Sequence, residues 1–254
     1  MRALNLPDWI QFNEIGGIPS NNYVIERPRE RWIIDPSIVP PPTPATVARS
    51  AEPQLRIIAT HAHYDHLLAL KKILSANPNS RFLIHCEDQP ALNDPTTNVA
   101  RLFGLEAVFP APDFLLEDND LIRLDEDLVL QVWRTPGHTP GSSCFLLSRH
   151  SGSRRSSDSE TASGNCFREE TLGSELGLRI LRPGKYIDLA DGAICLFTGD
   201  TLFCGGIGRT DLPGGSPRMM RDSLYLLHRR LTEMPPDLPV LSGHGPGFPA
   251  GDMA

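Results

Sequence analysis

The sequence predicts an α/β fold, and two observations support this prediction. Short apolar runs of strand length recur along the chain, and several are followed at once by a histidine or an aspartate that is flanked by glycine. Two other stretches have the character of helices. With 254 residues, of which 40% are hydrophobic, the chain is long enough for one large α/β domain or two small ones.

The N-terminal part of the chain is predicted to consist mainly of strands. Residues 22–26 and 31–35 flank a polar turn with a proline, which is typical of a β-hairpin. The apolar residues 55–59 indicate a short buried strand, and residues 81–85 indicate another. Residues 67–74, which lie between these two strands, are predicted to form a helix.

The C-terminal part of the chain continues this pattern. Residues 128–133 are strand-like, and apolar runs also precede Gly199 and Gly243. A helix is predicted with Ser216 at its N-cap and Pro217 at its first position. One face of this helix is apolar, so we expect it to pack on the core. The leucines of that face are Leu224, Leu227 and Leu231.

The most informative segment is residues 60–66, which read Thr-His-Ala-His-Tyr-Asp-His. It places three imidazoles and a carboxylate within six consecutive positions, and these groups suit zinc and related divalent ions as ligands. A packed core has little use for four such groups together, because each needs a partner when it is buried. The segment joins the strand 55–59 to the helix 67–74, so its side chains can converge on an ion. The sequence therefore predicts a metal site at this turn.

Further histidines and aspartates that could bind a metal follow later strands. His138 lies in a Thr-Pro-Gly-His-Thr-Pro-Gly turn, Asp200 follows Thr-Gly, and His244 stands between two glycines. A glycine-rich loop after Asp200 carries Arg209 and Asp211. Glycine permits tight turns and close approach of the backbone, as a metal site requires. Five of the eight histidines fall in these motifs. They are His61, His63, His66, His138 and His244.

At this point the chain resembles the metallo-β-lactamase superfamily. Residues 61–66 match the His-x-His-x-Asp-His motif of that superfamily. His138, Asp200 and His244 match its later ligand positions in the same order. The resemblance runs from about residue 22 to residue 247, so it covers nearly the whole chain.

Within the superfamily, residues 199–215 resemble the short glyoxalase II-like (hydroxyacylglutathione hydrolase-like) hydrolases and also the persulfide dioxygenases. The resemblance implies a four-layer αββα metallo-β-lactamase-type sandwich, with metals at one edge of the paired sheets, as a single domain over residues 1–254. Many relatives have small residues where this chain has Leu67 and Leu68. We expect these leucines to shift the helix that follows or to fill part of the pocket.

The resemblance also implies a role for each ligand. The residues implied at the first metal are His61, His63 and His138. Those implied at the second metal are Asp65, His66 and His244. Asp200 would bridge the two metals, and Asp65 and Asp200 are the implied catalytic carboxylates. Two cations about 3.5–4 Å apart share a hydroxide and polarise a carbonyl. The expected cofactors are two divalent ions, zinc first, with iron or manganese as the alternatives.

Three functions are compatible with this site. The first is hydrolysis of a glutathione-type thioester such as S-lactoylglutathione, since the metals would activate hydroxide and a thiolate is a good leaving group. The second is a sulfur oxygenase that resembles the persulfide dioxygenases, which use a single Fe(II); lactonase activity is a further alternative among hydrolases. The third is a non-catalytic metal-holding scaffold, against which the complete ligand set argues. We favour the thioester hydrolase.

Substrate recognition is predicted to involve Arg209. Ten residues follow His244, where the larger glyoxalase II enzymes carry a helical domain with glutathione contacts. We therefore expect a thiol-bearing substrate to be recognised elsewhere, and Arg209, close to Asp200, is the candidate substrate-binding residue. The alternative role of Arg209 is an ion pair with Asp211.

Composition narrows the classes of partner. The net charge of −7 argues against a general nucleic-acid binder. No run approaches the ~20 apolar residues of a membrane helix, and the first residues lack an apolar signal segment. We expect a cytoplasmic enzyme with a small-molecule substrate, or an organellar one if an import signal has been removed. Five scattered cysteines predict reduced thiols, not a disulfide framework.

The chain is predicted to carry an insertion at about residues 148–182. The 62 positions from His138 to Asp200 exceed what short relatives use. Residues 151–165 are rich in serine, glycine and charge, a composition that cannot bury enough surface to offset its ordering entropy. We expect a mobile surface loop there, with a lid over the active site as the alternative. Residues 176–181 are apolar enough to dock back onto the body.

Overall fold

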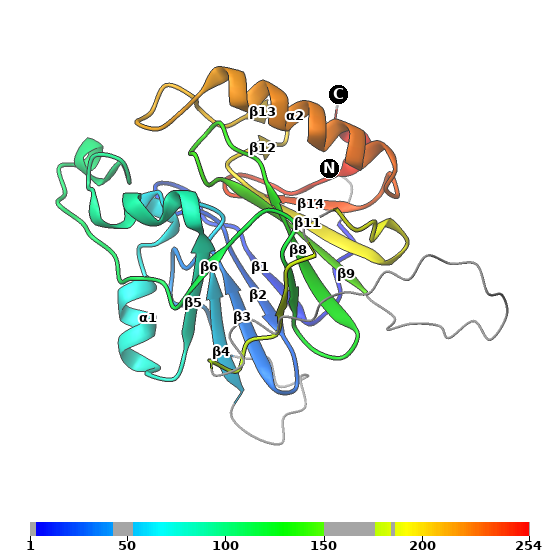
Figure 1. The fold of residues 1–254 in the computed structure, drawn as a ribbon, viewed down its shortest axis with the longest axis horizontal. Helices are drawn as coiled ribbons and strands as arrows, with labels where there is room; N and C mark the ends of the chain where they lie inside the picture. Colours follow the sequence, from blue (N-terminus) through cyan, green and yellow to red (C-terminus); the bar gives the residue numbers. More distant parts are fainter. Residues whose placement is uncertain (1–3, 43–52, 150–175, 184–185, 254) are drawn as a thin grey trace, which may run out of the picture.

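Two large β-sheets pack face to face in the computed structural model, and a helix covers the outer face of each (Figure 1). Helix α1 (Leu70–Ala76) lies on the first sheet and helix α2 (Pro217–Thr232) on the second. This is a four-layer αββα sandwich, so the predicted fold class is confirmed. The structure describes residues 4–42, 53–149, 176–183 and 186–253.

The first sheet has six strands in the order β1-β2-β3-β4-β5-β6. They are β1 (Ile10–Asn13), β2 (Asn22–Glu26), β3 (Glu30–Ile34), β4 (Gln54–Ile58), β5 (Arg81–His85) and β6 (Phe114–Leu116). Strands β1 to β3 are antiparallel, whereas β3 to β6 are parallel. The predicted hairpin is β2 and β3, and the predicted strands 55–59 and 81–85 are β4 and β5.

The second sheet has seven strands in the order β10-β7-β8-β9-β11-β14-β15. They are β7 (Leu121–Arg123), β8 (Leu128–Arg134), β9 (Ser143–Arg149), β10 (Ile180–Leu181), β11 (Ala193–Gly199), β14 (Pro239–Ser242) and β15 (Phe248–Pro249). All its neighbouring strands are antiparallel except β11 and β14. A separate hairpin joins β12 (Leu202–Phe203) to β13 (Gly206–Ile207).

Short 3-10 helices occupy several connections. They are η1 (Tyr64–His66), η2 (Cys86–Asn93), η3 (Ala100–Phe103), η5 (Ala190–Gly192) and η6 (Ala250–Asp252). Two of them matter for function, because η1 carries part of the predicted metal motif and η2 follows β5 at the same edge of the sheet.

Consecutive residues of the central strands face different layers. Ile58 of β4 packs between the two sheets, whereas its neighbour Ile57 packs under α1. In β11, Phe197 faces the space between the sheets and Leu196 faces α2. A strand alternates its side chains with a period of two, so a strand that is covered on both faces must be apolar at nearly every position. This explains the continuous apolar runs of the sequence.

Helix α1 corrects one expectation. It begins at Leu70, not at residue 67, because the 3-10 turn η1 and the residues after it first turn the chain. Leu67 is fully buried in the apolar cluster that includes Ala62 and Ile73. Its side chain therefore extends the core under α1.

Helix α2 confirms its prediction. The hydroxyl of Ser216 accepts a hydrogen bond from the backbone N–H of Met219, and Pro217 occupies the first turn. Leu227 and Leu231 are buried against the second sheet. The helix is therefore a structural layer.

The predicted insertion is described only in part. Residues 150–175, and with them the predicted mobile segment 151–165, lie outside the described residues. The later segment docks as predicted, since β10 pairs antiparallel with β7 and Leu178 is buried. Arg182 then forms an ion pair with Asp120. The chain thus rejoins the edge of the second sheet before it reaches β11.

The cysteines follow the prediction as far as the structure describes them. Cys86, Cys144, Cys195 and Cys204 are free thiols, and Cys166 lies outside the described residues. Among the helices of the described ranges, none combines the length and the apolar character that crossing a bilayer requires.

Candidate metal centre

The predicted metal-site residues all follow the carboxyl ends of strands. Residues 61–66 follow β4 of the first sheet, whereas His138 follows β8, Asp200 follows β11 and His244 follows β14 of the second. Strands β8, β11 and β14 run in the same direction, because β9 is antiparallel to both β8 and β11, and β14 is parallel to β11. Their carboxyl ends therefore lie at one edge of the sandwich, where the loop after β4 meets them.

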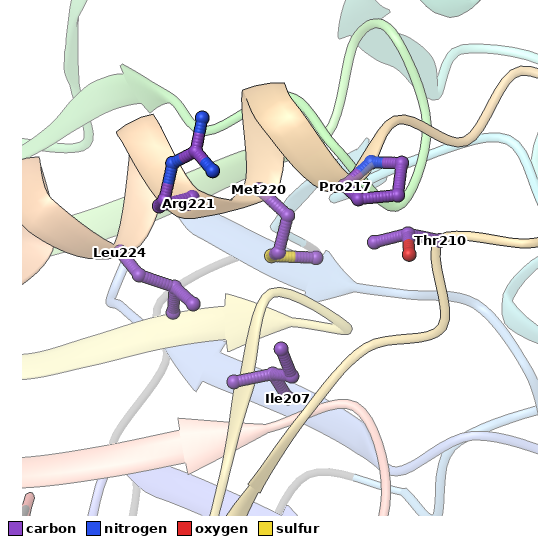
Figure 2. Close-up of a pocket in the computed structure, with 6 residues that line it drawn as sticks. All are labelled: Ile207, Thr210, Pro217, Met220, Arg221 and Leu224. Atoms are coloured by element: carbon purple, nitrogen blue, oxygen red, sulfur yellow. The ribbon is translucent and has the colours of Figure 1, made fainter.

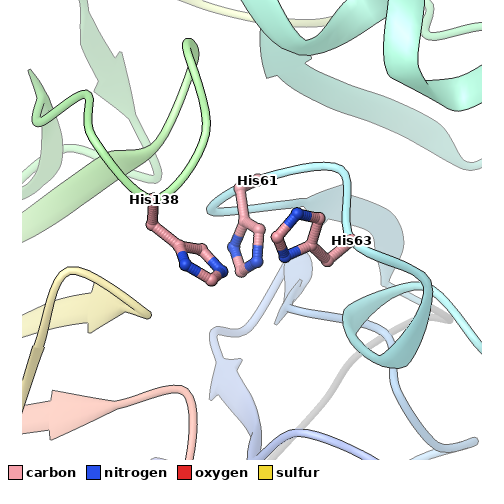
Figure 3. A group of neighbouring side chains, drawn as sticks. All are labelled: His61, His63 and His138. Atoms are coloured by element: carbon pink, nitrogen blue, oxygen red, sulfur yellow. The ribbon is translucent and has the colours of Figure 1, made fainter. Parts of the chain in front are cut away.

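Three histidines form a first group. The rings of His61 and His63 reach out from the loop after β4, and the ring of His138 meets them from the loop after β8 (Figure 3). The ring centroids are 4.7 Å apart for His61 and His63, and 4.4 Å apart for His63 and His138. Each of the three residues is at most 3% exposed. This is the arrangement of a closed three-nitrogen ligand set.

Asp65, His66 and His244 form a second group on the adjoining side. The His244 Nε2 atom lies 3.0 Å from a carboxylate oxygen of Asp65. His66 is fully buried, whereas the side chain of His244 is 33% exposed. The second group is therefore the side from which the centre opens to solvent.

Asp200 lies between the two groups. One of its oxygens is 3.2 Å from His66 Nε2, and the other is 3.5 Å from His138 Nε2 and 3.7 Å from His244 Nε2. A Cβ atom at Gly243 would approach Asp200 Oδ1 to 2.2 Å, so that position admits only glycine. The glycine beside His244 thus has a packing reason. The structure brings all seven sequence-predicted ligands together.

Unpaired buried atoms test whether a metal fits this site. The Nε2 atoms of His61, His63, His66 and His138 and the Oδ1 atom of Asp200 are buried and have no hydrogen-bond partner outside the site within the described residues, and His66 Nε2 and Asp200 Oδ1 lie 3.2 Å from each other. Buried polar groups without partners are costly and rare. Five such atoms facing one another are the donor set that a divalent cation takes. The residues fit the cofactor, and the groups are consistent with a binuclear metal site.

The protonation of the histidines agrees with this fit. Burial, reinforced by the neighbouring imidazoles, lowers the pKa of His61 well below its usual range, and burial together with His138 lowers the pKa of His63 to about 3. Both rings are therefore neutral at neutral pH, as metal ligation requires. Burial also opposes charge on His66, but Asp35, Asp200 and Asp65 outweigh it and raise the pKa of His66. A metal at the second group would displace that proton.

Asp35 is a functional residue that the sequence analysis missed. It is 1% exposed and lies at the end of β3. Its carboxylate accepts hydrogen bonds from His66 Nδ1 at 2.9 Å and from the backbone N–H of Thr60 at 2.7 Å. Such a bond fixes the ring so that Nε2 faces the site. The missed signal was an aspartate directly after an apolar strand, the same pattern that drew attention to Asp200.

His138 is oriented by the backbone of the glycine-rich loop. Its Nδ1–H donates to the carbonyl oxygen of Arg209 at 2.7 Å, which turns Nε2 toward the first group. The guanidinium of Arg209 is exposed and forms two hydrogen bonds with Asp211, at 2.8 and 2.9 Å. The ion pair weighed for Arg209 from the sequence is therefore present.

A small apolar cavity lies beyond this loop. It has a volume of about 190 Å³. Figure 2 shows its lining residues between α2 and the β12–β13 hairpin. Its wall includes Ile207, Thr210, Met220 and Leu224. Met220 also packs against the backbone of Gly137, next to His138. Thr210 of this wall directly follows Arg209, whose carbonyl oxygen orients His138.

Comparison with known proteins identifies the family. The family model of the metallo-β-lactamase superfamily matches residues 15–151. The chain belongs to the metallo-β-lactamase superfamily. Its fold and its histidine-rich site at the strand ends are thus those of a superfamily member, as the motif order predicted.

Three similar proteins place the chain within the superfamily. The Bacillus subtilis (strain 168) protein named "Probable metallo-hydrolase YqgX" is 28% identical over 91% of this chain and 88% of its own length. The human protein named "Persulfide dioxygenase ETHE1, mitochondrial" is 24% identical over 85% of this chain, but the match spans only 59% of ETHE1. The solved structure of TTHA1623 in a di-iron-bound form is 26% identical, with a TM-score of 0.58 over 95% of each chain.

Proposed function

We propose that this chain is a metal-dependent hydrolase that cleaves a glutathione-type thioester such as S-lactoylglutathione, in the manner of the short glyoxalase II-like enzymes. The observation that carries the proposal is the position of Asp200 between two complete ligand groups. Its carboxylate lies within 3.7 Å of imidazole nitrogens from both groups. This supports a site for two ions, which is the arrangement that activates water against an acyl carbon.

The ligand roles follow the two groups. The first ion would be held by His61, His63 and His138, and the second by Asp65, His66 and His244. Asp200 would bridge them, and zinc is the first choice of metal, with iron or manganese as alternatives. The metal pair, when bound, would supply an ionised water and polarise the scissile carbonyl. Asp65 and Asp200 would be the carboxylates closest to the reaction.

The burial of the ligands suggests where the substrate enters. The side chains of His66 and His138 are at most 4% exposed, whereas that of His244 is 33% exposed. A carbonyl would therefore approach from the side of His244. The leaving group of a thioester is a thiol with a pKa of about 8.5, so it departs as a thiolate without a dedicated acid. This agrees with the candidate centre, where the surrounding ionisable groups are assigned as metal ligands and none is assigned as a proton donor.

Arg209 is our candidate for contact with the substrate. Its side chain is exposed, and its carbonyl already touches the ring of His138. A carboxylate of a glutathione-type substrate would replace Asp211 at the guanidinium, which offers a two-pronged donor. We further propose that the partner is a small molecule, not a nucleic acid or a membrane.

A second candidate is a persulfide dioxygenase with one iron, which the similarity to ETHE1 favours. The persulfide dioxygenases keep much of the same motif set, so the ligands alone separate the two reactions poorly and an experiment has to decide between them. His244→Ala separates the two, since His244 belongs to the second group alone.

The deciding experiment compares two reactions in two metal forms. Thioester hydrolysis by the zinc protein is measured beside oxygen uptake by the iron protein with glutathione persulfide. We expect hydrolysis with zinc and its loss in His244→Ala. Iron-dependent oxygen uptake that survives in His244→Ala, with negligible thioester cleavage in any metal form, would replace the hydrolase with the dioxygenase.

A further inference from the structure

One buried carboxylate outside the ligand groups connects the two loops of the first group. Asp88 lies in η2, three residues after β5, and is 1% exposed. Its Oδ2 accepts hydrogen bonds from the backbone N–H of Ala62 at 2.9 Å and from the hydroxyl of Thr139 at 2.8 Å. Its Oδ1 accepts from the backbone N–H of Gly141 at 2.6 Å. Three donors thus converge on this one side chain.

The partners of Asp88 flank the first ligand group in the chain. Ala62 stands between His61 and His63, and Thr139 directly follows His138. The histidines come from different sheets, since one loop follows β4 and the other joins β8 to β9. Asp88 therefore connects the two loops next to all three imidazoles.

The surroundings of Asp88 are built for a carboxylate at this place. A Cβ atom at Gly141 would come within 2.7 Å of Asp88 Oδ1, so the loop approaches the carboxylate only because this residue is glycine. All three partners are donors, and an ionised carboxylate offers acceptors alone. An asparagine of the same shape would turn its NH₂ group toward at least one donor.

The second ligand group has a different buried carboxylate. Asp35 accepts from His66 Nδ1 directly and from Thr60, and its link to the first group is indirect, because the Thr60 hydroxyl also lies 3.1 Å from His61 Nδ1. Asp88 in turn bonds to no residue of the second group within the same ranges. Asp88 thus bonds only to the loops of the first group, whereas Asp35 bonds directly to His66 of the second group and reaches His61 through Thr60.

We propose that Asp88 is the positioning residue of the first metal site: it holds the loop of His61 and His63 against the loop of His138, so that three imidazoles face one ion. The inference rests on the metal binding proposed above and is independent of the substrate. Loss of an outer residue that orients ligands costs about 10–100-fold in metal affinity. Asp88→Asn should therefore weaken one of two zinc sites by that factor and leave the other unchanged.

The first experiment titrates zinc into metal-free wild type, Asp88→Asn and Asp120→Asn, with a competing chelator. Asp120 is the matched control, because it is also fully buried and accepts three hydrogen bonds, from the backbone of Glu117 and from Arg182. We expect unchanged zinc affinity in Asp120→Asn even where its melting temperature falls. A merely structural role of Asp88 would lower its melting temperature in the same way and leave both zinc affinities at wild-type values.

The second experiment assigns the affected site. In a His244→Ala background, where the first group remains intact, Asp88→Asn should weaken the remaining zinc site about 10–100-fold. In a His63→Ala background, where the first group is already lost, it should have no further effect on the second site. Equal effects in both backgrounds would refute the assignment to the first group.

A smaller change covers the case in which Asp88→Asn does not fold. Thr139→Val removes one hydrogen bond to Asp88 while it keeps the shape of the side chain, and Thr139→Ser keeps the hydroxyl. We expect weaker zinc binding at one site in Thr139→Val and wild-type affinity in Thr139→Ser. If both Asp88→Asn and Thr139→Val bound zinc at two sites with wild-type affinity, the proposed role of Asp88 would be overturned and the proposed function would stand. A wild type that binds no zinc would overturn both the proposed function and this inference.

Discussion

Replacement of Asp200 by alanine should abolish the stabilisation that zinc gives to the protein. Asp200 is the contact shared by the two ligand groups, with imidazole nitrogens of His66, His138 and His244 at 3.2–3.7 Å. Without its carboxylate, two cations would have no shared anion between them, and their repulsion would be unopposed. Both ions, not one, should therefore be lost or greatly weakened.

The size of the effect follows from linkage. A ligand at 100 times its Kd stabilises the folded state by about 2.7 kcal/mol, so two independent ions contribute about 5 kcal/mol. For a protein of this length, 1 kcal/mol corresponds to about 2–4 °C in Tm, and saturation with zinc should raise the Tm of the wild type by about 10–20 °C. In Asp200→Ala, zinc should raise the Tm by only a small part of this amount.

The assay is a thermal melt of each metal-free protein with and without zinc, beside elemental analysis. Asp237→Ala is a suitable control, since Asp237 is exposed and precedes β14 at the end opposite to His244. It should show the full gain. If Asp200→Ala gained as much as the wild type and retained two ions, the bridging assignment would be wrong.

Three further predictions follow from the same structure. Elemental analysis after saturation with zinc should give two ions per chain, and a ceiling of one would contradict the two-metal site. Leu227→Ala, which empties a fully buried position between α2 and the second sheet, should destabilise the protein by about 2–5 kcal/mol in urea unfolding; Tyr225→Ala on the exposed face should change stability by no more than about 0.5 kcal/mol. Burial, with Arg134 and Arg182 nearby, lowers the pKa of His85 from 6.5 to about 4. Between pH 6.5 and 4, His85 is therefore protonated in the unfolded chain but neutral in the folded one. The metal-free protein should thus lose stability as the pH falls from 6.5 to 4. His85→Asn should flatten that dependence, and an unchanged slope would count against it.

The residues that meet at the candidate metal centre could be predicted because each has a local signature. His138, Asp200 and His244 each follow an apolar strand and adjoin glycine, and residues 61–66 concentrate four ligand types at one turn. Strand ends at one edge of a sandwich come together whatever the details of the loops. The order of these signatures along the chain was therefore enough to anticipate both groups.

The supporting carboxylates could not be predicted in this way. The partner of Asp35 at His66 is 31 positions away, and the partner of Asp88 at Gly141 is 53 positions away. A single aspartate after a strand is common in turns, and only the folded structure shows which donors reach it. The start of α1 was misjudged for a related reason. Leu67 has a helical character in sequence, but the chain must first turn to place His66 against Asp35.

The spacing of the metal centre is a property of the packed sheets as much as of its loops. The proposed ligands of residues 61–66 follow β4 in the first sheet, and the other three follow β8, β11 and β14 in the second. Between these sheets, the ring of Tyr23 packs on Phe197, and its hydroxyl donates to the carbonyl of Ser242, two residues before His244. Phe197 itself stands three residues before Asp200. The inter-sheet core therefore sets the distance between the ligand loops, and Asp88 and Asp35 adjust their orientation within that distance. A substitution in the inter-sheet core should thus alter metal binding although it replaces no ligand.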